Sequence, residues 1–202
     1  MPDHRAPSIT VLILAGGQGE RMGGSDKGLV ECAGRPLIEH VLSRIGPCAD
    51  AILICANRTL DTYGRYGYPV LEDTTADFSG PLAGIARGLE QCVTDWLWIL
   101  PCDAPQVDAE LLERLLDACR TQEASAAVPI EGGRMHATCA LLCRDTLPSL
   151  NAYLERGHRA VHAWLRTLPA AEIGCDDHPE WFVNLNTPEE LAAYAARLRS
   201  NI

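Results

Sequence analysis

The residues best suited to phosphate chemistry lie in a glycine-rich stretch near the start of the chain. The run 9–14 is apolar except for Thr10, residues 16–24 contain five glycines, and the cations Arg21 and Lys27 lie in or just after them. A continuous apolar run predicts a strand buried on both faces, and the loop after such a strand lies at the carboxyl edge of a parallel sheet, where α/β proteins bind ligands. Because glycine has no Cβ, backbone N–H groups can surround an anion there. The stretch therefore predicts phosphate binding.

Lys27 gives a second reason to expect phosphate. It is the only lysine in the chain, and the other 16 of the 17 Lys+Arg residues are arginines. A lysine ammonium is a compact point charge, whereas an arginine guanidinium is a planar fork. One lysine could remain by chance, but its place beside the glycines favours a function.

Asp103 is the second candidate for chemistry. It follows the apolar run 96–100 and lies between Pro101 and Pro105, so we expect it at the same sheet edge as the glycines. Mg²⁺ prefers one or two carboxylates together with phosphate oxygens and water, which makes Asp103 a candidate metal ligand. The alternative is a helix cap, but Asp108 is better placed to cap the next helix.

Two common phosphate motifs do not fit the glycine-rich stretch. A Walker A loop needs Gly-Lys-Ser/Thr, but Lys27 is preceded by Asp26 and followed by Gly28. The dinucleotide fingerprint G-x-G-x-x-G fits Gly17 and Gly19 and then meets Met22.

Apolar strands alternate with amphipathic helical patterns along the rest of the chain, which is typical of βαβ units and a mainly parallel sheet. The predicted strands cover 9–14, 29–32, 51–55, 70–71, 96–100, 126–130, 137–143 and 182–185. The predicted helices cover 36–45, 59–66, 80–92, 108–122, 146–156, 159–167 and 188–199. The last helix should begin with a capping box at 187–190 and a proline in its first turn.

Composition narrows the possible partners. A chain of 202 residues with 47% hydrophobic residues predicts one globular domain, 1–202, with 1–8 disordered. The net charge of −10 argues against nucleic acid and anionic membranes as partners. No signal peptide or membrane-spanning run is evident, so we expect a cytoplasmic protein, and a monomer.

Metal binding by cysteine or histidine is not expected. The nine cysteines include no C-x-x-C pair, and in a reducing compartment they are best explained as small core residues. Cys139 and Cys143 have no matching second pair for zinc, and His158 and His162, also four residues apart, have no nearby carboxylate motif.

The glycine-rich stretch resembles the signature loop of the molybdenum cofactor guanylyltransferases, in the segment Leu14-Ala15-Gly16-Gly17-x-x-x-Arg21-Met22-Gly23-Gly24-x-Asp26-Lys27-Gly28. The resemblance extends to the turn Pro101-Cys102-Asp103 and to Asn184-Leu185-Asn186-Thr187-Pro188. It implies a Rossmann-like three-layer α/β/α domain of the nucleotide-diphospho-sugar transferase type. The implied reaction joins GMP from GTP to molybdopterin, with Mg²⁺ as cofactor and other proteins of cofactor biosynthesis as partners.

The resemblance also implies roles for particular residues. The N-terminal half would bind nucleotide, through Leu14, Ala15, Gly16, Gly17, Lys27, Cys55, Asp73, Gly80 and Asp103. The C-terminal half would bind molybdopterin, through Asn184, Asn186 and Arg159. Lys27, Arg21 and Mg²⁺ on Asp103 would stabilise phosphate charge, and no general base is needed because the attacking phosphate is already anionic.

The sequence departs from the family pattern at two places. Cys55 stands where an asparagine touching the nucleotide is expected, and His136-Ala137-Thr138 replaces His-Pro-Thr. The roles of Cys55 and His136 therefore stay open.

Three alternatives remain. A cytidylyltransferase acting on the same cofactor resembles Leu-Ala-Ala-Gly at the loop start, whereas here the absence of a methyl group at Gly16 leaves room for a purine. A sugar-phosphate nucleotidyltransferase is usually longer. A GTP-binding adaptor without turnover would need neither Lys27 nor Asp103 at the α-phosphate.

Overall fold

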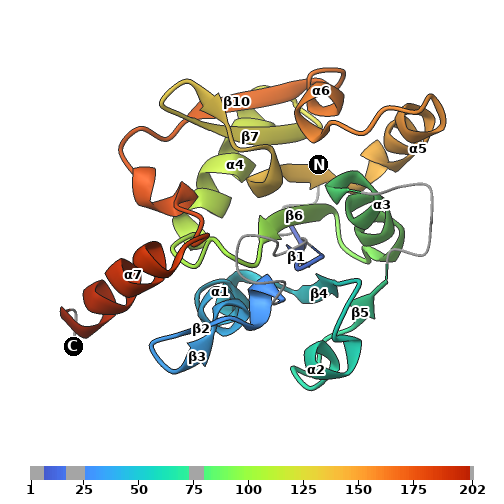
Figure 1. Ribbon diagram of the computed structural model, residues 1–202. Helices are drawn as coiled ribbons and strands as arrows, with labels where there is room; N and C mark the ends of the chain where they lie inside the picture. The colour runs from blue at the N-terminus through green and yellow to red at the C-terminus, as the bar shows by residue number, and fades with distance from the viewer. Residues whose placement is uncertain (1–6, 17–25, 73–79, 201–202) are drawn as a thin grey trace.

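The alternation of apolar strands and amphipathic helices builds a mostly parallel sheet. In the computed structural model, which describes residues 7–16, 26–72 and 80–200, these ranges form an eight-stranded sheet in the order β10-β7-β9-β6-β1-β4-β5, with β8 paired to β7 (Figure 1). Its strands are β1 (Ile9–Leu14), β4 (Ala51–Cys55), β5 (Val70–Leu71), β6 (Trp96–Pro101), β7 (Ala126–Glu131), β8 (Arg134–Met135), β9 (Leu141–Cys143) and β10 (Ala170–Gly174).

The four strands nearest the glycine-rich stretch all run in one direction. β1 lies between β4 and β6, parallel to both, and β5 extends the parallel set beyond β4. β9 runs antiparallel to β6 and to β7, while β10 is parallel to β7. The carboxyl ends of β1, β4, β5 and β6 therefore meet at one edge of the sheet.

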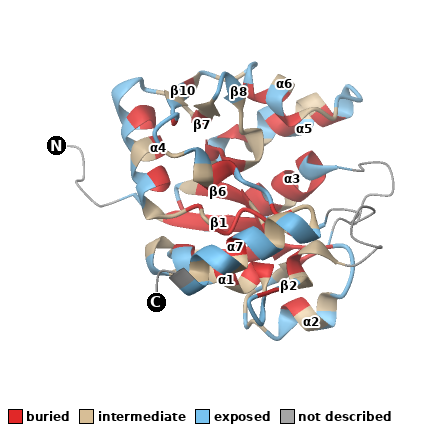
Figure 2. Ribbon diagram, turned by 60° about the vertical axis from the view of Figure 1, so that its left-hand side comes forward, coloured by how far each residue is buried: buried red, intermediate tan, exposed pale blue. Residues whose placement is uncertain are grey.

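Helices cover both faces of this sheet and bury its apolar side chains (Figure 2). One core packs the sheet against α1 (Leu37–Ile45), α2 (Leu60–Gly64) and α4 (Ala109–Thr121). The other packs it against α3 (Pro81–Gln91), α5 (Leu147–Glu155) and α6 (Val161–Leu165). The expected three-layer α/β/α architecture with a mainly parallel central sheet is confirmed.

A third, smaller core joins an early segment of the chain to its last helix. Cys32 and Leu37, from the hairpin of β2 (Glu31–Cys32) and β3 (Arg35–Pro36) and the start of α1, pack against Leu185 and Tyr194. Tyr194 belongs to α7 (Pro188–Ser200). This contact brings the segment before α7 beside the residues that follow the glycine-rich stretch.

The helix starts follow from local sequence. The Asp108 side chain accepts a hydrogen bond from the Glu110 N–H at 3.1 Å and so caps α4 as expected. At α7 the Thr187 hydroxyl accepts from the Glu190 N–H at 3.2 Å, and the Glu190 carboxylate accepts from the Thr187 N–H at 2.9 Å. The predicted capping box is confirmed.

Two predicted strands were wrong, and one five-residue strand was missed. Residues 182–185 do not form a strand: 179–182 form a 3-10 helix, because Trp181 and Phe182 turn into the core as one compact turn. The predicted strand 137–143 begins as a 3-10 helix, Ala137–Cys139, and only Leu141–Cys143 pairs with the sheet. Strand β10 was not predicted, because its pattern, Ala-Ala-Glu-Ile-Gly, carries few large apolar residues.

Residues 1–6 lie outside the described part of the chain. Ser8, which falls in the segment expected to lack order, bonds through its hydroxyl to Asp95 Oδ2 at 2.8 Å. None of the helices described here has the length and apolar character that crossing a bilayer requires.

Helix α3 approaches the sheet closely through glycines. A Cβ at Gly88 would lie 2.5 Å from Leu12 Cδ2, and Leu12 is fully buried, so its side chain cannot swing into solvent. The close contact brings the α3 backbone down onto β1.

We therefore expect Gly88→Ala to lower the free energy of unfolding by about 1 to 2 kcal/mol, because overpacking outweighs the better helix propensity of alanine. Gly64→Ala in α2 is the matched control, since a Cβ there meets nothing within 4 Å and the change should be neutral or stabilising. Urea unfolding of both variants measures the difference. Equal stabilities would contradict this account of the α3 contact.

Candidate active site

The carboxyl edge of the sheet holds the first part of the glycine-rich stretch between two strand ends. The Ala15 N–H donates to the Cys55 carbonyl at 2.8 Å, and the Cys102 N–H donates to the Leu14 carbonyl at 3.1 Å. The parallel pairing thus continues past the ends of β1, β4 and β6. Gly16 is placed between the residues that follow β4 and the turn that carries Asp103.

Lys27, Asp103 and Asn186 meet at this edge although they lie far apart in sequence. The Lys27 ammonium forms an ion pair with Asp103 Oδ2 and donates a hydrogen bond to Asn186 Oδ1. Asp103 is 5% exposed and the Lys27 side chain 19% exposed, so water screens the pair less than it would at the surface. The structure therefore brings together two predicted catalytic residues and one predicted acceptor-binding residue.

The backbone around Asn186 is held by the same capping box that starts α7. The Asn186 N–H donates to Glu190 Oε2 at 2.6 Å, and the Leu185 N–H donates to the Asp103 carbonyl at 3.0 Å. The Asn186 amide nitrogen also donates to the Asn184 carbonyl at 3.1 Å. Asn184 itself is exposed next to this contact. Sequence reasoning gave Glu190 only a capping role, and its link to Asn186 is visible only in three dimensions.

The backbone of Lys27 is held from its other side by α2. Lys27 opens a 3-10 helix, Lys27–Leu29, in which the Leu29 N–H donates to the Asp26 carbonyl at 3.0 Å. The hydroxyl of Tyr63 donates to Asp26 Oδ1, and the Thr59 hydroxyl donates to Asp26 Oδ2 at 3.1 Å. Sequence reasoning assigned no role to Asp26, Thr59 or Tyr63, because nothing in their spacing signals the contact.

The other predicted nucleotide-binding residues of the edge line the same region. Gly80 precedes α3 with a φ of +134°, a conformation that favours glycine, and a Cβ at Gly84 would lie 2.7 Å from the sulfur of Cys55. Cys55 is 4% exposed and its sulfur faces α3. A Cβ on Gly16 would lie 3.4 Å from Asn57 Nδ2. An asparagine amide is thus present beside the loop, two residues after Cys55, and its position just past β4 could have been read from sequence.

Arg159 is not brought to this cluster by the contacts described for it. Its guanidinium donates to the Leu154 and His158 carbonyls at 3.0 and 2.7 Å, so it binds the C-terminal end of α5. In Figure 1, α5 and α7 lie on opposite sides of the molecule. Gly17, Arg21 and Asp73, also predicted site residues, lie outside the described residues.

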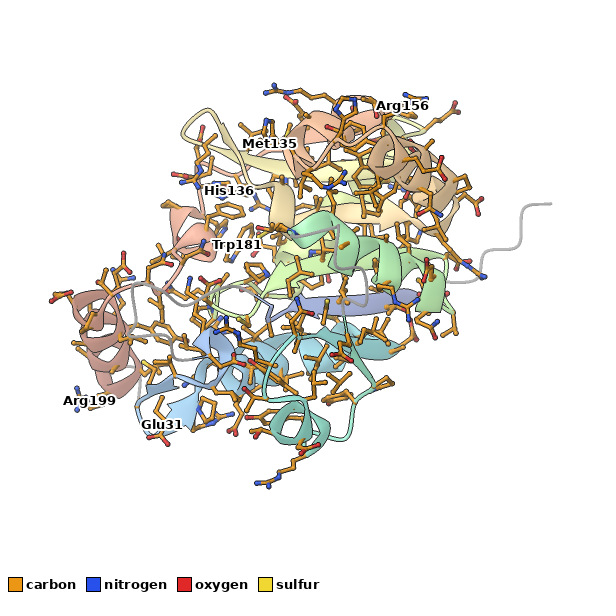
Figure 3. The ribbon with its side chains drawn as sticks, turned by 45° about the vertical axis from the view of Figure 1, so that its right-hand side comes forward. Glu31, Met135, His136, Arg156, Trp181 and Arg199 are labelled. Carbon is orange, nitrogen blue, oxygen red and sulfur yellow. The ribbon has the colours of Figure 1, made fainter. Side chains whose placement is uncertain are left out.

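His136 stands beside the segment that leads to Asn184. Its ring stacks on Phe182 with centroids 4.0 Å apart, and Figure 3 shows it near Trp181, between β7 and α7. Burial lowers the pKa of His136, although Glu131 Oε2 lies 3.4 Å from its Nε2 without the geometry of a hydrogen bond. A neutral ring at pH 7 follows, which suits packing against Phe182.

Two buried groups next to the cluster are held in their neutral forms. Burial is the largest cause that raises the pKa of Tyr63 far above its usual value, and the hydrogen bond to Asp26 is the second. Burial, followed by the nearby charge of Asp103, raises the pKa of Cys139 to about 12. Both remain protonated at pH 7, so neither adds a charge to the cluster.

The residues present can hold a metal only with help from a substrate. Asp103 offers one carboxylate, and the described residues contain no group of three or more His, Cys, Asp or Glu side chains arranged around a metal position. Mg²⁺ is commonly bound by one or two carboxylates together with substrate phosphates, so this donor set fits a metal that arrives with a nucleotide.

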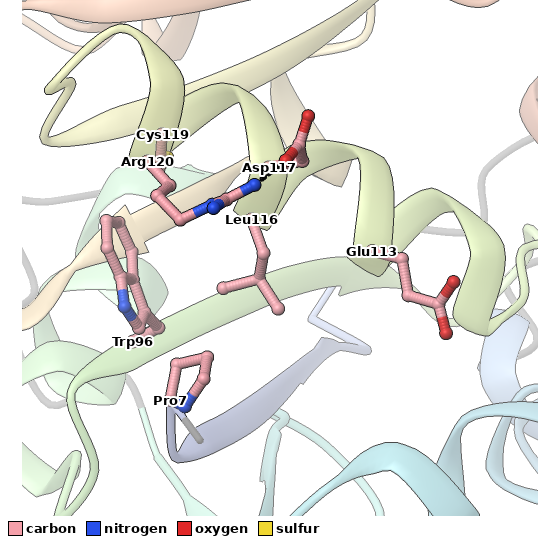
Figure 4. Close-up of a pocket in the computed structure, with 7 residues that line it drawn as sticks. All are labelled: Pro7, Trp96, Glu113, Leu116, Asp117, Cys119 and Arg120. Atoms are coloured by element: carbon pink, nitrogen blue, oxygen red, sulfur yellow. Dashed lines mark hydrogen bonds and ion pairs between the residues drawn. The ribbon is translucent and has the colours of Figure 1, made fainter. Parts of the chain in front are cut away.

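A groove of about 560 Å³ lies at the opposite edge of the sheet, over α4 (Figure 4). Pro7 and Trp96, which line it, stand at the amino ends of β1 and β6. None of its lining residues belongs to the predicted site, so the groove is separate from the Lys27 cluster.

The fold and the lysine–carboxylate pair define an α/β protein with a candidate ligand site at the carboxyl ends of its parallel strands. A model of the MobA-like NTP transferase domain matches residues 11–172. A solved structure of molybdopterin-guanine dinucleotide biosynthesis protein A from Archaeoglobus fulgidus superposes with a TM-score of 0.78, covering 96% of this chain and 100% of that one at 23% identity. At that identity the likeness shows the fold.

Closer relatives in sequence define the family. The molybdenum cofactor guanylyltransferase of Vibrio parahaemolyticus is 43% identical over 183 residues, which is 91% of this chain and 93% of the relative. The enzyme of that name from Cupriavidus metallidurans is 41% identical over 197 residues, 95% of this chain and 97% of the relative. The chain belongs to the molybdenum cofactor guanylyltransferase family of MobA-like NTP transferases, as the glycine-rich stretch predicted.

The Lys27–Asp103 pair should behave as one energetic unit. Removing either charge leaves the other partly buried without its partner, which is costly, whereas removing both is not. We expect Lys27→Met and Asp103→Asn each to destabilise the protein, and the double variant to be less destabilised than the sum by about 1 to 3 kcal/mol. Urea unfolding of the four proteins gives this coupling energy. Additivity within about 0.5 kcal/mol would mean that the pair does not form in solution.

Proposed function

We propose that this protein transfers GMP from GTP to the terminal phosphate of molybdopterin and releases pyrophosphate. The observation that carries the proposal is the meeting of Lys27, Asp103 and Asn186 at the carboxyl edge of the sheet. Two residues that the family resemblance assigns to nucleotide binding, Lys27 and Asp103, thus meet one that it assigns to acceptor binding, Asn186. The names of the relatives supply the reaction, and the geometry supplies a place where both substrates could react.

The chemistry is an in-line displacement at the α-phosphorus of GTP. An oxygen of the acceptor phosphate forms a bond to that phosphorus, the bond from it to the oxygen of the β-phosphate breaks, and its electron pair leaves with pyrophosphate. The attacking oxygen is already anionic, so no proton must be removed. The protein acts by positioning the reactants and by neutralising charge.

Lys27 is the described residue that would contact the α-phosphate and the leaving group. Its ammonium can exchange the Asp103 and Asn186 oxygens for phosphate oxygens without leaving the sheet edge. Arg21, outside the described residues, would hold the outer phosphates, because a guanidinium binds phosphate oxygens in a bidentate manner. The backbone from Leu14 through Gly17, the side of Cys55 and Asn57, Asp73, and the start of α3 at Gly80 would surround the nucleoside.

Mg²⁺ bound by Asp103 and the phosphates would neutralise charge that develops on the leaving group.

On the acceptor side, Asn186 and Asn184 would contact molybdopterin, and Arg159 would pair with its phosphate if the acceptor reaches the end of α5. We place this reaction in the cytoplasm, in a monomer that receives its acceptor from other proteins of cofactor biosynthesis.

The decisive experiment incubates the purified protein with Mo-molybdopterin and one nucleoside triphosphate, with and without Mg²⁺, and detects pyrophosphate and the dinucleotide by mass spectrometry. We expect turnover with GTP and Mg²⁺. Efficient use of CTP in place of GTP would make the protein a cytidylyltransferase instead.

Binding can be followed separately from turnover because the chain has a single lysine. The only amines that an acetylating reagent can modify are Lys27 and the α-amino group of the chain, and peptide mass spectrometry separates the two from each other and from modified cysteines or tyrosines. GTP should protect Lys27 and leave the α-amino group reactive. Protection without any turnover would identify a GTP-binding adaptor, and no protection would remove Lys27 from the nucleotide site.

Gly16 provides a test of base selection. A methyl group there would contact Asn57 at 3.4 Å, an ordinary van der Waals distance, so the apo protein should tolerate it. We expect Gly16→Ala to lower the ratio of kcat/KM for GTP to kcat/KM for CTP at least about tenfold. A clash with the purine that raises the activation free energy for GTP by about 1.4 kcal/mol is enough for this change. Thermal unfolding checks that the fold is intact. An unchanged GTP/CTP ratio would show that the glycine does not select the base.

A further inference from the structure

We propose that Tyr63, with Thr59, is a positioning residue that fixes the backbone of Lys27 through Asp26, and that α2 serves the active site for this reason. The inference rests on the proposed function for the identity of the reaction, but its geometry is independent of the substrate. None of the three residues is expected to touch a reacting atom.

The first support is the pair of hydrogen bonds on the Asp26 carboxylate. Both oxygens are occupied, Oδ1 by the Tyr63 hydroxyl and Oδ2 by the Thr59 hydroxyl at 3.1 Å. Hydrogen bonds to a charged acceptor are about twice as strong as neutral ones. Two donors on two oxygens fix both the position and the rotation of the carboxylate. Asp26 is the residue before Lys27, so its backbone and that of Lys27 are fixed together.

The second support is the burial of Tyr63. The residue is fully buried, at 0% exposure, in the core that packs α1 and α4 on the sheet. A ring that is held in the core cannot follow movements of a surface loop, so its hydroxyl is a fixed point for Asp26. Burial and the hydrogen bond to Asp26 raise the pKa of this hydroxyl, which keeps it a donor at any physiological pH.

The third support is the absence of a side chain at Gly28. A Cβ there would lie 2.5 Å from the Tyr63 hydroxyl and 3.4 Å from the Cβ of Cys102. The residue after Lys27 must therefore be glycine for the Tyr63 hydroxyl to reach past it to Asp26. Cys102 adjoins Asp103, so the same close packing sets the distance between the Lys27 backbone and the Asp103 turn.

Thr59 provides a fourth, weaker support. It precedes α2 with a φ of +53°, in the left-handed region that is unfavourable for a β-branched residue. That conformation is maintained at the residue whose hydroxyl reaches Asp26. The contact offers a physical reason for the unusual backbone.

The lysine side chain is thereby held at both ends. Its ammonium contacts Asp103 and Asn186, and its Cα is fixed through Asp26 and α2. A lysine has four rotatable side-chain bonds. If only the ammonium were fixed, the methylene groups and the Cα behind it would be free to move. A displacement of about 1 Å at a catalytic group can cost about 100-fold in rate.

The test removes one oxygen atom. Tyr63→Phe keeps the buried ring, and Tyr66→Phe is the matched control, because the Tyr66 hydroxyl lies 3.4 Å from Glu39 Oε1 and takes no part in the Asp26 contact. We expect Tyr63→Phe to lower kcat about 10- to 100-fold with a smaller change in KM for GTP, and Tyr66→Phe to leave both near wild type. Asp26→Asn retains an oxygen acceptor for Tyr63 and should lose less activity than Asp26→Ala.

A second measurement does not depend on activity. Protein labelled with ¹⁵N-lysine has one labelled residue, so its amide spectrum contains a single backbone signal, that of Lys27. We expect the order parameter of this amide to fall from about 0.85 to below about 0.6 in Tyr63→Phe and to stay unchanged in Tyr66→Phe. This outcome would support positioning even if the protein showed no guanylyltransferase activity, which would refute the proposed function alone.

The contrary result is equally clear. If Tyr63→Phe lowers only the melting temperature, with kcat and the Lys27 amide dynamics unchanged, then Tyr63 stabilises α2 and does not position Lys27. If the variant unfolds, the Asp26→Asn and Asp26→Ala pair carries the test, because neither changes the buried ring. Equal kcat in those two variants would overturn the proposal.

Discussion

The ion pair between Lys27 and Asp103 is the constraint on which the rest of this molecule depends. Lys27 follows β1 and Asp103 follows β6, much later in the sequence, and Asn186 joins them from a third segment. A carboxylate that is 5% exposed needs a cation beside it, because an unpaired charge in a site of low polarity is strongly unfavourable. Every element that fixes the distance between residues 27, 103 and 186 therefore contributes to both stability and function. These elements are the β1–β6 pairing, the turn after β6, the hairpin β2–β3 and the capping box of α7.

The same constraint explains why small residues line the contacts around this point. Gly28 allows Tyr63 and Cys102 to approach, Gly84 allows α3 to approach Cys55, and Gly88 lets α3 reach Leu12. Each glycine lets two elements approach more closely than a side chain would allow, Gly28 and Gly84 near the carboxyl edge and Gly88 further down the sheet. The result is a site whose walls are helices and strand ends, which can hold a flexible lysine more precisely than loops alone. The groove over α4 lies at the other edge of the sheet and lacks this construction.

Much of this site could be predicted from sequence, for reasons that are local. The strand before the glycines, the strand before Asp103 and the capping box before α7 each have a continuous sequence pattern, and parallel topology then brings their ends together. The contacts of Asp26 could not be predicted, because they depend on where α2 lies in space. The expected strand at 182–185 was wrong because a compact 3-10 turn buries Trp181 and Phe182. A short alternation of apolar and polar residues does not distinguish such a turn from a strand. Leu185 is nevertheless buried, whereas Asn184 is exposed and Asn186 is partly exposed.

The charges at the described site do not by themselves attract a triphosphate to a chain of net charge −10. The Lys27 ammonium and the Asp103 carboxylate sum to zero, and Asp26 adds a negative charge next to them, so these residues offer a nucleotide no net attraction. Under the proposed function the missing positive charge must come from Arg21 and from a divalent cation that arrives with the phosphates. A cation on Asp103 would replace Lys27 as the partner of that carboxylate. Lys27 would then be released to contact the α-phosphate, and the hold on its backbone would keep the ammonium in range while its partner changes. Under the proposed function Asp103, which is the counterion of Lys27 in this structure, would become a ligand of the metal once the nucleotide is bound.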